Sequence, residues 1–217
     1  MRPPENLSLF PESAGRSTGD TFFYEGLARR TGYHFIAGVD EAGRGPLAGP
    51  VVAGAVILPP DPELPGVRDS KMMTARARDE AFDVICGEAL AAAVGVVPHE
   101  YIDEFNILKA SLEAMARAVK ALEPRPETLL VDGIHPVPLP ITQKCLKKGD
   151  QISVSISAAS VLAKVYRDRI MRSYHKMYPV YGFDKNKGYG TRQHLEALKR
   201  HGSCPVHRLT FKRVRQG

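Results

Sequence analysis

One stretch, FIAGVDEAGRGPLAGPVVAGAVIL at residues 35–58, constrains the fold more than any other part of the chain. Its two apolar ends are typical of buried strands, and the glycine-punctuated segment between them is typical of a turn. Two adjacent carboxylates, Asp40 and Glu41, stand where the first strand ends. The sequence therefore predicts a hairpin-like pair of strands with acids at its mouth. Because side chains alternate along a strand, both acids can reach one site only if the backbone bends there.

The predicted turn holds Arg44 between Gly43 and Gly45. Glycines permit a tight bend, and without side chains their backbone N–H groups can approach a bulky ligand closely. A lone Asp-Glu pair would fit an ordinary solvated turn. An arginine between two glycines, directly after the acids, favours a binding site instead.

Length and composition are those of a single globular domain. The chain has 217 residues, of which 43% are hydrophobic and 25% charged, enough to bury a sizeable core. No apolar run approaches the roughly 18 residues of a membrane helix, and we see no secretory signal, so we expect no membrane association. The cysteines Cys86, Cys145 and Cys204 are odd in number and far apart, which fits neither a disulfide framework nor a zinc site. We therefore expect a reducing, cytoplasmic location.

Charge is distributed unevenly along the chain. Residues 144–217 contain 17 Lys and Arg against 4 Asp and Glu, whereas residues 1–143 contain 13 against 20. Such asymmetry indicates a polyanionic partner, with nucleic acid the leading candidate, although a solvated basic surface would give the same counts.

The remainder of the chain alternates helix and strand signals. Thr74 is a plausible N-cap, and the helix predicted after 156 opens with small residues that would let it pack closely on a sheet. Helices are predicted over 21–30, 74–87, 99–122, 157–178 and 192–201, and further strands over 89–97, 128–131 and 152–156.

Carboxylates from three separated segments form the candidate site: Asp40, Glu41, Asp132 and Asp150. Asp132 follows an apolar strand and precedes a glycine, as in the first unit. Carboxylates gathered at strand ends repel one another unless cations lie between them, and oxygen ligands suit Mg²⁺ or Mn²⁺. A pair of such ions can activate water for attack on a phosphodiester. Taken singly, Asp132 and Asp150 are equally typical of turns.

Two further residues are candidates. Asp168 shares a helix face with Val161 and Val165, so it either reaches the metal ions in place of Asp150 or forms a buried ion pair with one of the nearby arginines at 167, 169 and 172. Tyr189, in a glycine-rich basic loop, could stack on a base or sugar, or it could be a buried support for that loop.

In their order along the chain, these motifs resemble those of the ribonuclease HII family. The blocks that carry the resemblance span roughly residues 35 to 211: DEAGRGPLAGPVVAGAVIL at 40–58, DSK at 69–71, FNIL at 105–108, VDG at 131–133, KKGD at 147–150, SISAASVLAKVYRDR at 155–169 and NKGYGT at 186–191. Met72-Met73 and Ile134-His135 depart from the usual family pattern, which leaves some substrate contacts open but does not touch the carboxylates.

The resemblance implies an α/β fold of the RNase H-like type, with a mixed central β-sheet flanked by helices and a C-terminal helical appendage. We expect residues 1–32 to be a variable, poorly ordered N-terminal extension, 33–180 the catalytic domain, and 181–217 the basic C-terminal loop and helical appendage. The resemblance also implies a monomeric, metal-dependent endonuclease. Such an enzyme would hydrolyse the RNA strand of RNA–DNA hybrids and cut 5′ of single ribonucleotides in duplex DNA, leaving a 3′-hydroxyl and a 5′-phosphate.

Carried over residue by residue, the resemblance assigns the roles of catalytic residue and ligand of Mg²⁺ or Mn²⁺ to Asp40, Glu41, Asp132 and Asp150. Asp168 then keeps a supporting role. Substrate contacts fall on the turn that reads the 2′-hydroxyl, on phosphate-binding positions and on a junction-reading tyrosine: Gly43, Arg44, Gly45, Ser70, Lys71 and Tyr189. A different metal-dependent nuclease on the same fold and a non-catalytic hybrid-binding protein stay open as alternatives. Four mutually repelling acids argue against the second.

Overall fold

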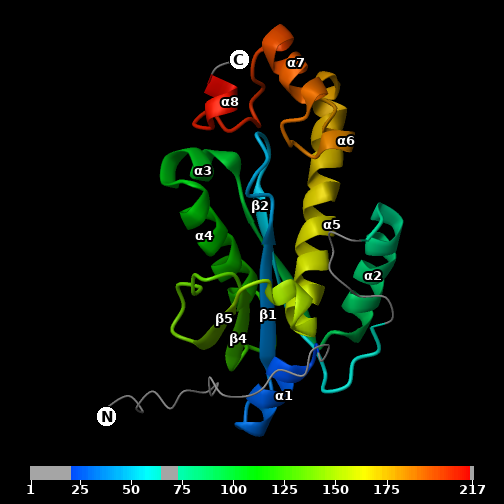
Figure 1. The fold of residues 1–217 in the computed structure, drawn as a ribbon, viewed down its shortest axis with the longest axis vertical. Helices are drawn as coiled ribbons and strands as arrows, with labels where there is room; N and C mark the ends of the chain where they lie inside the picture. The colour runs from blue at the N-terminus through cyan, green and yellow to red at the C-terminus, as the bar shows by residue number, and fades with distance from the viewer. Residues whose placement is uncertain (1–20, 65–72, 216–217) are drawn as a thin grey trace.

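The computed structural model describes residues 21–64 and 73–215, so the predicted phosphate contacts Ser70 and Lys71 lie outside the described residues. In the described part, five strands form one sheet in the order β3-β2-β1-β4-β5 (Figure 1). Their bounds are β1 Ile36–Ala42, β2 Val51–Ile57, β3 Ala91–Val97, β4 Thr128–Asp132 and β5 Thr142–Leu146. Strands β1, β2 and β3 run antiparallel, whereas β4 is parallel to β1 and β5 to β4. The predicted hairpin and mixed sheet are confirmed.

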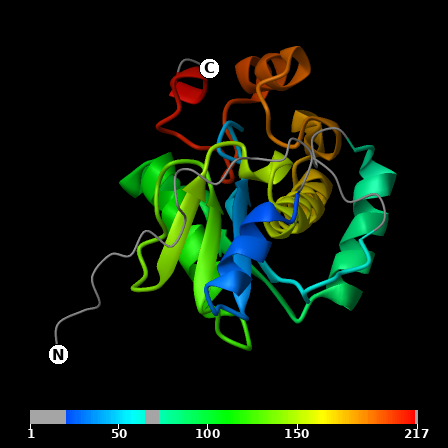
Figure 2. The same ribbon diagram turned by 60° about the horizontal axis from the view of Figure 1, so that its bottom comes forward.

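Helices cover both faces of this sheet (Figure 2). On one face, α4 (Ile107–Lys120) packs its alanines against Val39 and Ala53 in the largest core cluster. On the other face, α5 (Val154–Met177) and α2 (Ala75–Glu88) share a second cluster with Val56. This arrangement confirms the predicted RNase H-like α/β fold.

Close approach of α5 to the sheet depends on glycines in the strands. A Cβ on Gly38 would lie 2.0 Å from the carbonyl carbon of Ser155, and a Cβ on Gly54 would lie 2.3 Å from the carbonyl oxygen of Ala159. Neither position has room for a side chain, because interiors are close-packed. The small residues at the start of α5 therefore lie directly on β1 and β2, as predicted.

The C-terminal appendage sits at the end of the sheet where β1 ends (Figure 1). It consists of η2 (Pro179–Tyr181), α6 (Phe183–Asn186), α7 (Arg192–His201) and α8 (Lys212–Arg215). Tyr181 and Phe183 pack with Met171 of α5 and with Leu47 of the β1–β2 turn in a separate apolar cluster. The appendage is thereby joined to the turn that follows the acids. No helix in the described ranges combines the length and apolarity that crossing a bilayer requires.

The prediction of a strand over 152–156 is wrong. These residues follow the 3₁₀ turn η1 (Gly149–Gln151) and begin α5. Ser153 caps the helix by accepting a hydrogen bond from the N–H of Ile156, and it donates to the buried carboxylate of Glu25 at 2.5 Å. Glu25 lies on α1 (Phe23–Arg30), a predicted helix inside the segment assigned to an extension. A cap that depends on a residue so far away in sequence overrides the apolar alternation.

The remaining strand is β5, in a segment that the sequence pattern alone marked as a basic connection. As the edge strand beside β4, it leaves Gln143 and Lys144 partly exposed, so it lacks the apolar run of a central strand. The predicted helix over 99–122 is also divided, into α3 (His99–Phe105) and α4. Asn106 adopts a φ of 77° between them, and its side chain accepts from the N–H groups of Leu108 and Lys109.

Candidate active site

Three of the predicted carboxylates meet at one end of the sheet. Strands β1 and β4 are parallel neighbours in register, so the acids at their carboxyl ends lie side by side. Asp40 hydrogen-bonds to Ser160 on α5, whereas Glu41 borders a pocket beside α4, as the alternation of strand side chains requires. Asp132 lines the pockets on both sides. After β1 the chain turns at Gly43, with a φ of 98°, and both adjacent acids still border the pocket on the α5 side.

The electrostatics of this cluster favour the binding of a cation. Burial, reinforced by the charges of Glu41 and Asp132, raises the pKa of Asp40 well above its ordinary value. Burial also raises the pKa of Glu41, and Asp132 adds to that effect, while the ion pair with Arg44 opposes it. Arg44 Nη1 lies 2.9 Å from Glu41 Oε1, with about half of its own side chain exposed. Arg44 is thus a side-chain cation that partly offsets the acids.

Asp150 is placed next to the cluster by the backbone. The N–H of Gly149 donates to Asp132 Oδ1 at 2.6 Å, which ties η1 to the end of β4. Asp150 follows directly and is buried. Asp150 is not among the described residues that line the two pockets at the acids. The structure therefore brings together Asp40, Glu41 and Asp132. Asp150 directly follows Gly149, whose N–H is hydrogen-bonded to Asp132.

The acids fit a hard divalent cation by their chemistry. Their donors are all carboxylate oxygens, which Mg²⁺ and Mn²⁺ prefer, and they carry more negative charge than Arg44 alone can balance. Within 21–64 and 73–215, no group of three or more His, Cys, Asp or Glu side chains is already arranged to hold a metal ion. Glu41 and Asp132 are each engaged by the hydrogen bonds given above, to Arg44 and Gly149.

Two buried arginines hold the turn between β1 and β2, and sequence reasoning missed their role. Arg208 donates at 2.6–3.3 Å to the carbonyl oxygens of Gly43, Arg44, Gly49 and Pro50. Arg167 donates at 2.9–3.2 Å to those of Ala48, Pro50 and Lys187. Burial lowers the pKa of Arg208 to about 9 and that of Arg167 to about 10, so both guanidinium groups are charged at neutral pH. Two buried guanidinium groups, both charged, therefore fix the turn after the acids through its carbonyl oxygens.

Tyr189 borders the same pocket from the appendage. Its side chain is 46% exposed, and a Cβ on Gly45 would lie 3.6 Å from Tyr189 Cε1, so the ring lies beside the glycine turn. The structure thus places the predicted residues Gly43, Arg44, Gly45 and Tyr189 around the acids. This exposed ring differs from the buried, loop-supporting tyrosine that the sequence left open.

Asp168 forms ion pairs on α5 that the sequence did not predict. Its partners are Lys164, at 2.6 Å, and Arg78 of α2, at 3.4 Å, not the arginines at 167, 169 and 172. Lys164 itself lines the pocket at the acids, and burial lowers its pKa. Asp168 therefore connects α2 to α5 and holds a lysine that faces the site. The spacing of Lys164 and Asp168 by four residues on one helix was the available signal.

A chain of buried hydrogen bonds supports Tyr189 from behind. The N–H of Cys204 donates to His207 Nδ1 at 2.9 Å, so the proton of this imidazole lies on Nε2. His207 Nε2 then donates to His194 Nε2 at 3.0 Å, and His194 Nδ1 donates to the carbonyl oxygen of Tyr189 at 2.9 Å. Both rings are almost fully buried and neutral in this arrangement.

This chain predicts acid sensitivity. Burial, together with His194, lowers the pKa of His207 to about 4, and burial lowers that of His194. The unfolded chain, with histidine pKa values near 6.5, binds more protons than the folded chain below that pH. The free energy of unfolding should therefore fall by on the order of 3 kcal/mol between pH 7 and pH 4 through His207. Urea unfolding across this range would measure it.

The matched control for the acid prediction uses two histidines of the same region. Replacing His207 with glutamine should flatten the loss of stability between pH 7 and pH 4. Replacing the exposed His201 at the end of α7 should leave the wild-type slope unchanged. Equal slopes for wild type and His207→Gln would show that the histidine chain is not responsible.

A mixed sheet with helices on both faces and acids at the ends of two parallel neighbouring strands is the arrangement expected of metal-dependent, RNase H-like hydrolases. The family model described as Ribonuclease HII matches residues 37–214. The chain belongs to the ribonuclease HII family, and this membership implies ribonuclease H activity on RNA–DNA hybrids.

Relatives and solved structures agree with this assignment. Ribonuclease HII of Geobacter sulfurreducens is 54% identical over 97% of this chain and 96% of its own length. Ribonuclease HII of Syntrophus aciditrophicus is 56% identical over 87% of this chain and 89% of its own. The structure of ribonuclease H2 from Pyrococcus horikoshii, 29% identical, superposes with a TM-score of 0.69 over 83% of this chain and 95% of that one. A ribonuclease HIII solved in complex with Mn²⁺, 18% identical with a TM-score of 0.62, shares the fold over 87% of this chain and 70% of that one.

Proposed function

We propose that this enzyme cuts on the 5′ side of single ribonucleotides embedded in duplex DNA as well as within RNA–DNA hybrids, leaving a 3′-hydroxyl and a 5′-phosphate. The observation that carries the proposal is the pocket where Asp40, Glu41 and Asp132 face the Gly43–Gly45 turn and the exposed ring of Tyr189. One wall of this pocket is acidic, and the other presents backbone and an aromatic ring. A ribonucleotide offers groups for both walls, namely a scissile phosphate and a sugar with a 2′-hydroxyl.

Asp40, Glu41, Asp132 and Asp150 are proposed to hold two divalent ions, Mg²⁺ or Mn²⁺. When bound, such ions supply an activated water and stabilise the leaving oxygen of the phosphodiester. The structurally similar ribonuclease HIII was solved with Mn²⁺ bound, which supports the same type of ion here. Arg44, which pairs with Glu41 at 2.9 Å and is about half exposed, would then contact a phosphate of the substrate.

The glycine turn is proposed to recognise the 2′-hydroxyl. Arg208 takes up the carbonyl oxygens of Gly43 and Arg44, so we expect the N–H groups of the turn to be the backbone groups that bind substrate. Tyr189, beside Gly45, would pack on the sugar that follows the ribonucleotide. Lys164 and the buried Arg167, which also line this pocket, would favour the approach of a polyanion.

The test is cleavage of a DNA duplex with one embedded ribonucleotide, in Mg²⁺, in Mn²⁺ and in EDTA. An all-DNA duplex and an RNA–DNA hybrid serve as controls. We expect a metal-dependent cut at the 5′ side of the ribonucleotide and none in all-DNA. Cleavage of the hybrid alone would reject incision at single ribonucleotides while keeping the acid cluster as the site.

We further propose that the protein acts as a monomer in the cytoplasm, where its three free cysteines would stay reduced.

A further inference from the structure

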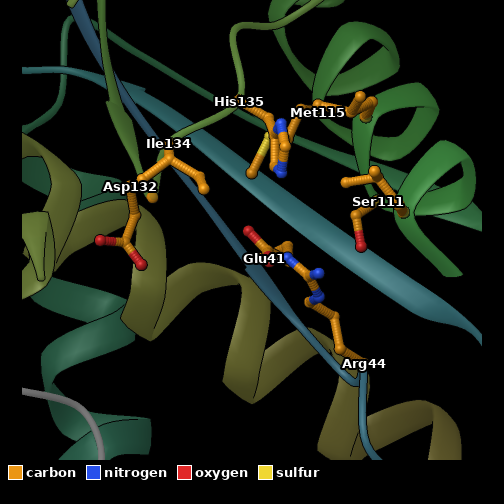
Figure 3. A pocket seen from close by; sticks show the side chains of 10 residues that line it. Glu41, Arg44, Ser111, Met115, Asp132, Ile134 and His135 are labelled. Carbon is orange, nitrogen blue, oxygen red and sulfur yellow. Dashed lines mark hydrogen bonds and ion pairs between the residues drawn. The ribbon is translucent and has the colours of Figure 1, made fainter. Parts of the chain in front are cut away.

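A second pocket lies on the α4 side of the acids (Figure 3). It has a volume of about 230 Å³, several times the roughly 30 Å³ that one water occupies in the liquid, so a ring-sized group can enter it. Glu41, Arg44 and Asp132 form the wall that it shares with the acid cluster. Its other walls come from α4 and from the loop after β4: Leu108, Ser111, Leu112, Met115, Gly133, Ile134 and His135.

Ser111 is the unusual member of this lining. Its side chain is 1% exposed, and its hydroxyl has no hydrogen-bond partner among the residues that the structure describes. Figure 3 shows this hydroxyl pointing into the pocket, toward Arg44. A buried hydroxyl without a partner costs folding free energy, because it has given up water without replacement. Such a group is expected where a ligand completes the hydrogen bond.

The remaining lining has the character of a nucleotide site. Ile134 leaves 60% of its surface exposed beside the acids, and with Leu112 and Met115 it presents an apolar surface to a sugar or base. Arg44, on the wall shared with the acids, and His135, on the loop after β4, supply donors for phosphate oxygens. An apolar surface, one buried hydroxyl and basic groups near a phosphate-cleaving centre match the parts of a nucleotide.

We infer that this pocket seats the nucleotide of the cleaved strand that precedes the scissile phosphate, whose 3′-hydroxyl is released. The inference rests on the proposed function, in which the Tyr189 side takes the ribonucleotide and the sugar after it. A strand that crosses Glu41, Arg44 and Asp132 from that side enters the α4 pocket with its preceding nucleotide. Ser111 then binds a polar atom of this nucleotide, and Ile134 packs against its ring.

The test combines two variants with truncated ligands, measured as binding in Ca²⁺ so that no cleavage is needed. The full duplex contains one ribonucleotide. A second duplex lacks the cleaved strand upstream, so that this strand begins with the 5′-phosphate of the ribonucleotide. A third duplex keeps the upstream part of the cleaved strand but lacks the part of the complementary strand that pairs with it. Ser111→Ala and Ile134→Ala should each weaken binding of the full duplex by about 10-fold, the value of one good contact. Neither should change binding of the second duplex, and both should weaken binding of the third.

Thermal unfolding of the free protein gives an independent readout. Ser111→Ala removes an unsatisfied buried hydroxyl, so the Tm should rise by roughly 2–4 °C even though ligand binding weakens. Ser173→Ala, at an exposed position of α5, controls for helix propensity and should not affect ligand binding. Ile134→Ala keeps the test valid if Ser111→Ala misfolds, because Ile134 is mostly exposed.

Each other outcome rejects the inference. A lower Tm for Ser111→Ala would make the hydroxyl a structural group with a partner of its own. If the variants weaken binding of the full and second duplexes equally, their effect does not come from the preceding nucleotide. If they do not weaken binding of the third duplex, the contact is with the complementary strand instead. Failure of the proposed function would look different, because the wild-type protein itself would then bind the ribonucleotide-containing duplex no better than all-DNA.

Discussion

Replacing Asp40 with asparagine is expected to lower the rate of metal-dependent cleavage by about 10³-fold or more, while the protein stays folded and becomes more stable without metal. Asparagine keeps the oxygen that accepts the N–H of Glu41 at 2.7 Å, so the backbone at the end of β1 is retained. What it removes is one charge from a buried group of acids. Single-turnover cleavage of a hybrid would give the rate, and thermal unfolding in EDTA would give the stability.

The gain in stability should depend on pH with a definite sign. Because the folded state raises the pKa of Asp40, the unfolded chain ionises first, and the wild-type protein loses stability as the pH rises from the ordinary carboxyl pKa to the raised pKa of the folded state. The advantage of Asp40→Asn should thus be present at pH 7 and disappear below about pH 4. Asp79→Asn, which removes a partly exposed partner of Arg169, controls for charge alone and should cleave normally. A near-normal rate for Asp40→Asn would exclude this carboxylate from the site.

Replacing Arg208 with lysine should destabilise the protein by about 3–5 kcal/mol, which corresponds to a fall in Tm of roughly 10 °C. Lysine keeps the charge but cannot reproduce the guanidinium fork, which bonds four carbonyl oxygens of the β1–β2 turn at once. Two of these oxygens belong to Gly43 and Arg44, so cleavage should also be impaired at temperatures where the variant is folded.

The control for Arg208→Lys is Arg200→Lys, on the exposed side of α7, which should change neither Tm nor cleavage. Denaturant unfolding and cleavage at about 20 °C would separate the two effects. A folded variant with normal cleavage would show that the turn keeps its geometry without Arg208, which would contradict the role inferred from the hydrogen bonds.

Local patterns in the sequence predicted the central elements because those elements depend on residues close together in the chain. The two apolar runs around the glycine turn form β1 and β2, and Thr74 caps α2 by accepting from the N–H of Ala77. The strand over 152–156 failed for the opposite reason. Its alternation of apolar residues is genuine, but a cap completed by Glu25 on α1 makes the segment helical. No window of local sequence contains both partners.

The same distinction applies to the site. By itself the sequence determined which chemical groups the chain can offer, namely adjacent acids after a strand, an arginine between glycines and a basic C-terminal third. Only the tertiary structure decided which of these groups meet. Parallel pairing of β1 with β4 brings Asp132 to Asp40 and Glu41, and the appendage returns Arg208 to the turn that follows them. Tertiary contacts also raise the pKa of Asp40 and bury the Ser111 hydroxyl without a hydrogen-bond partner among the described residues, because both effects arise from neighbours that are distant along the chain.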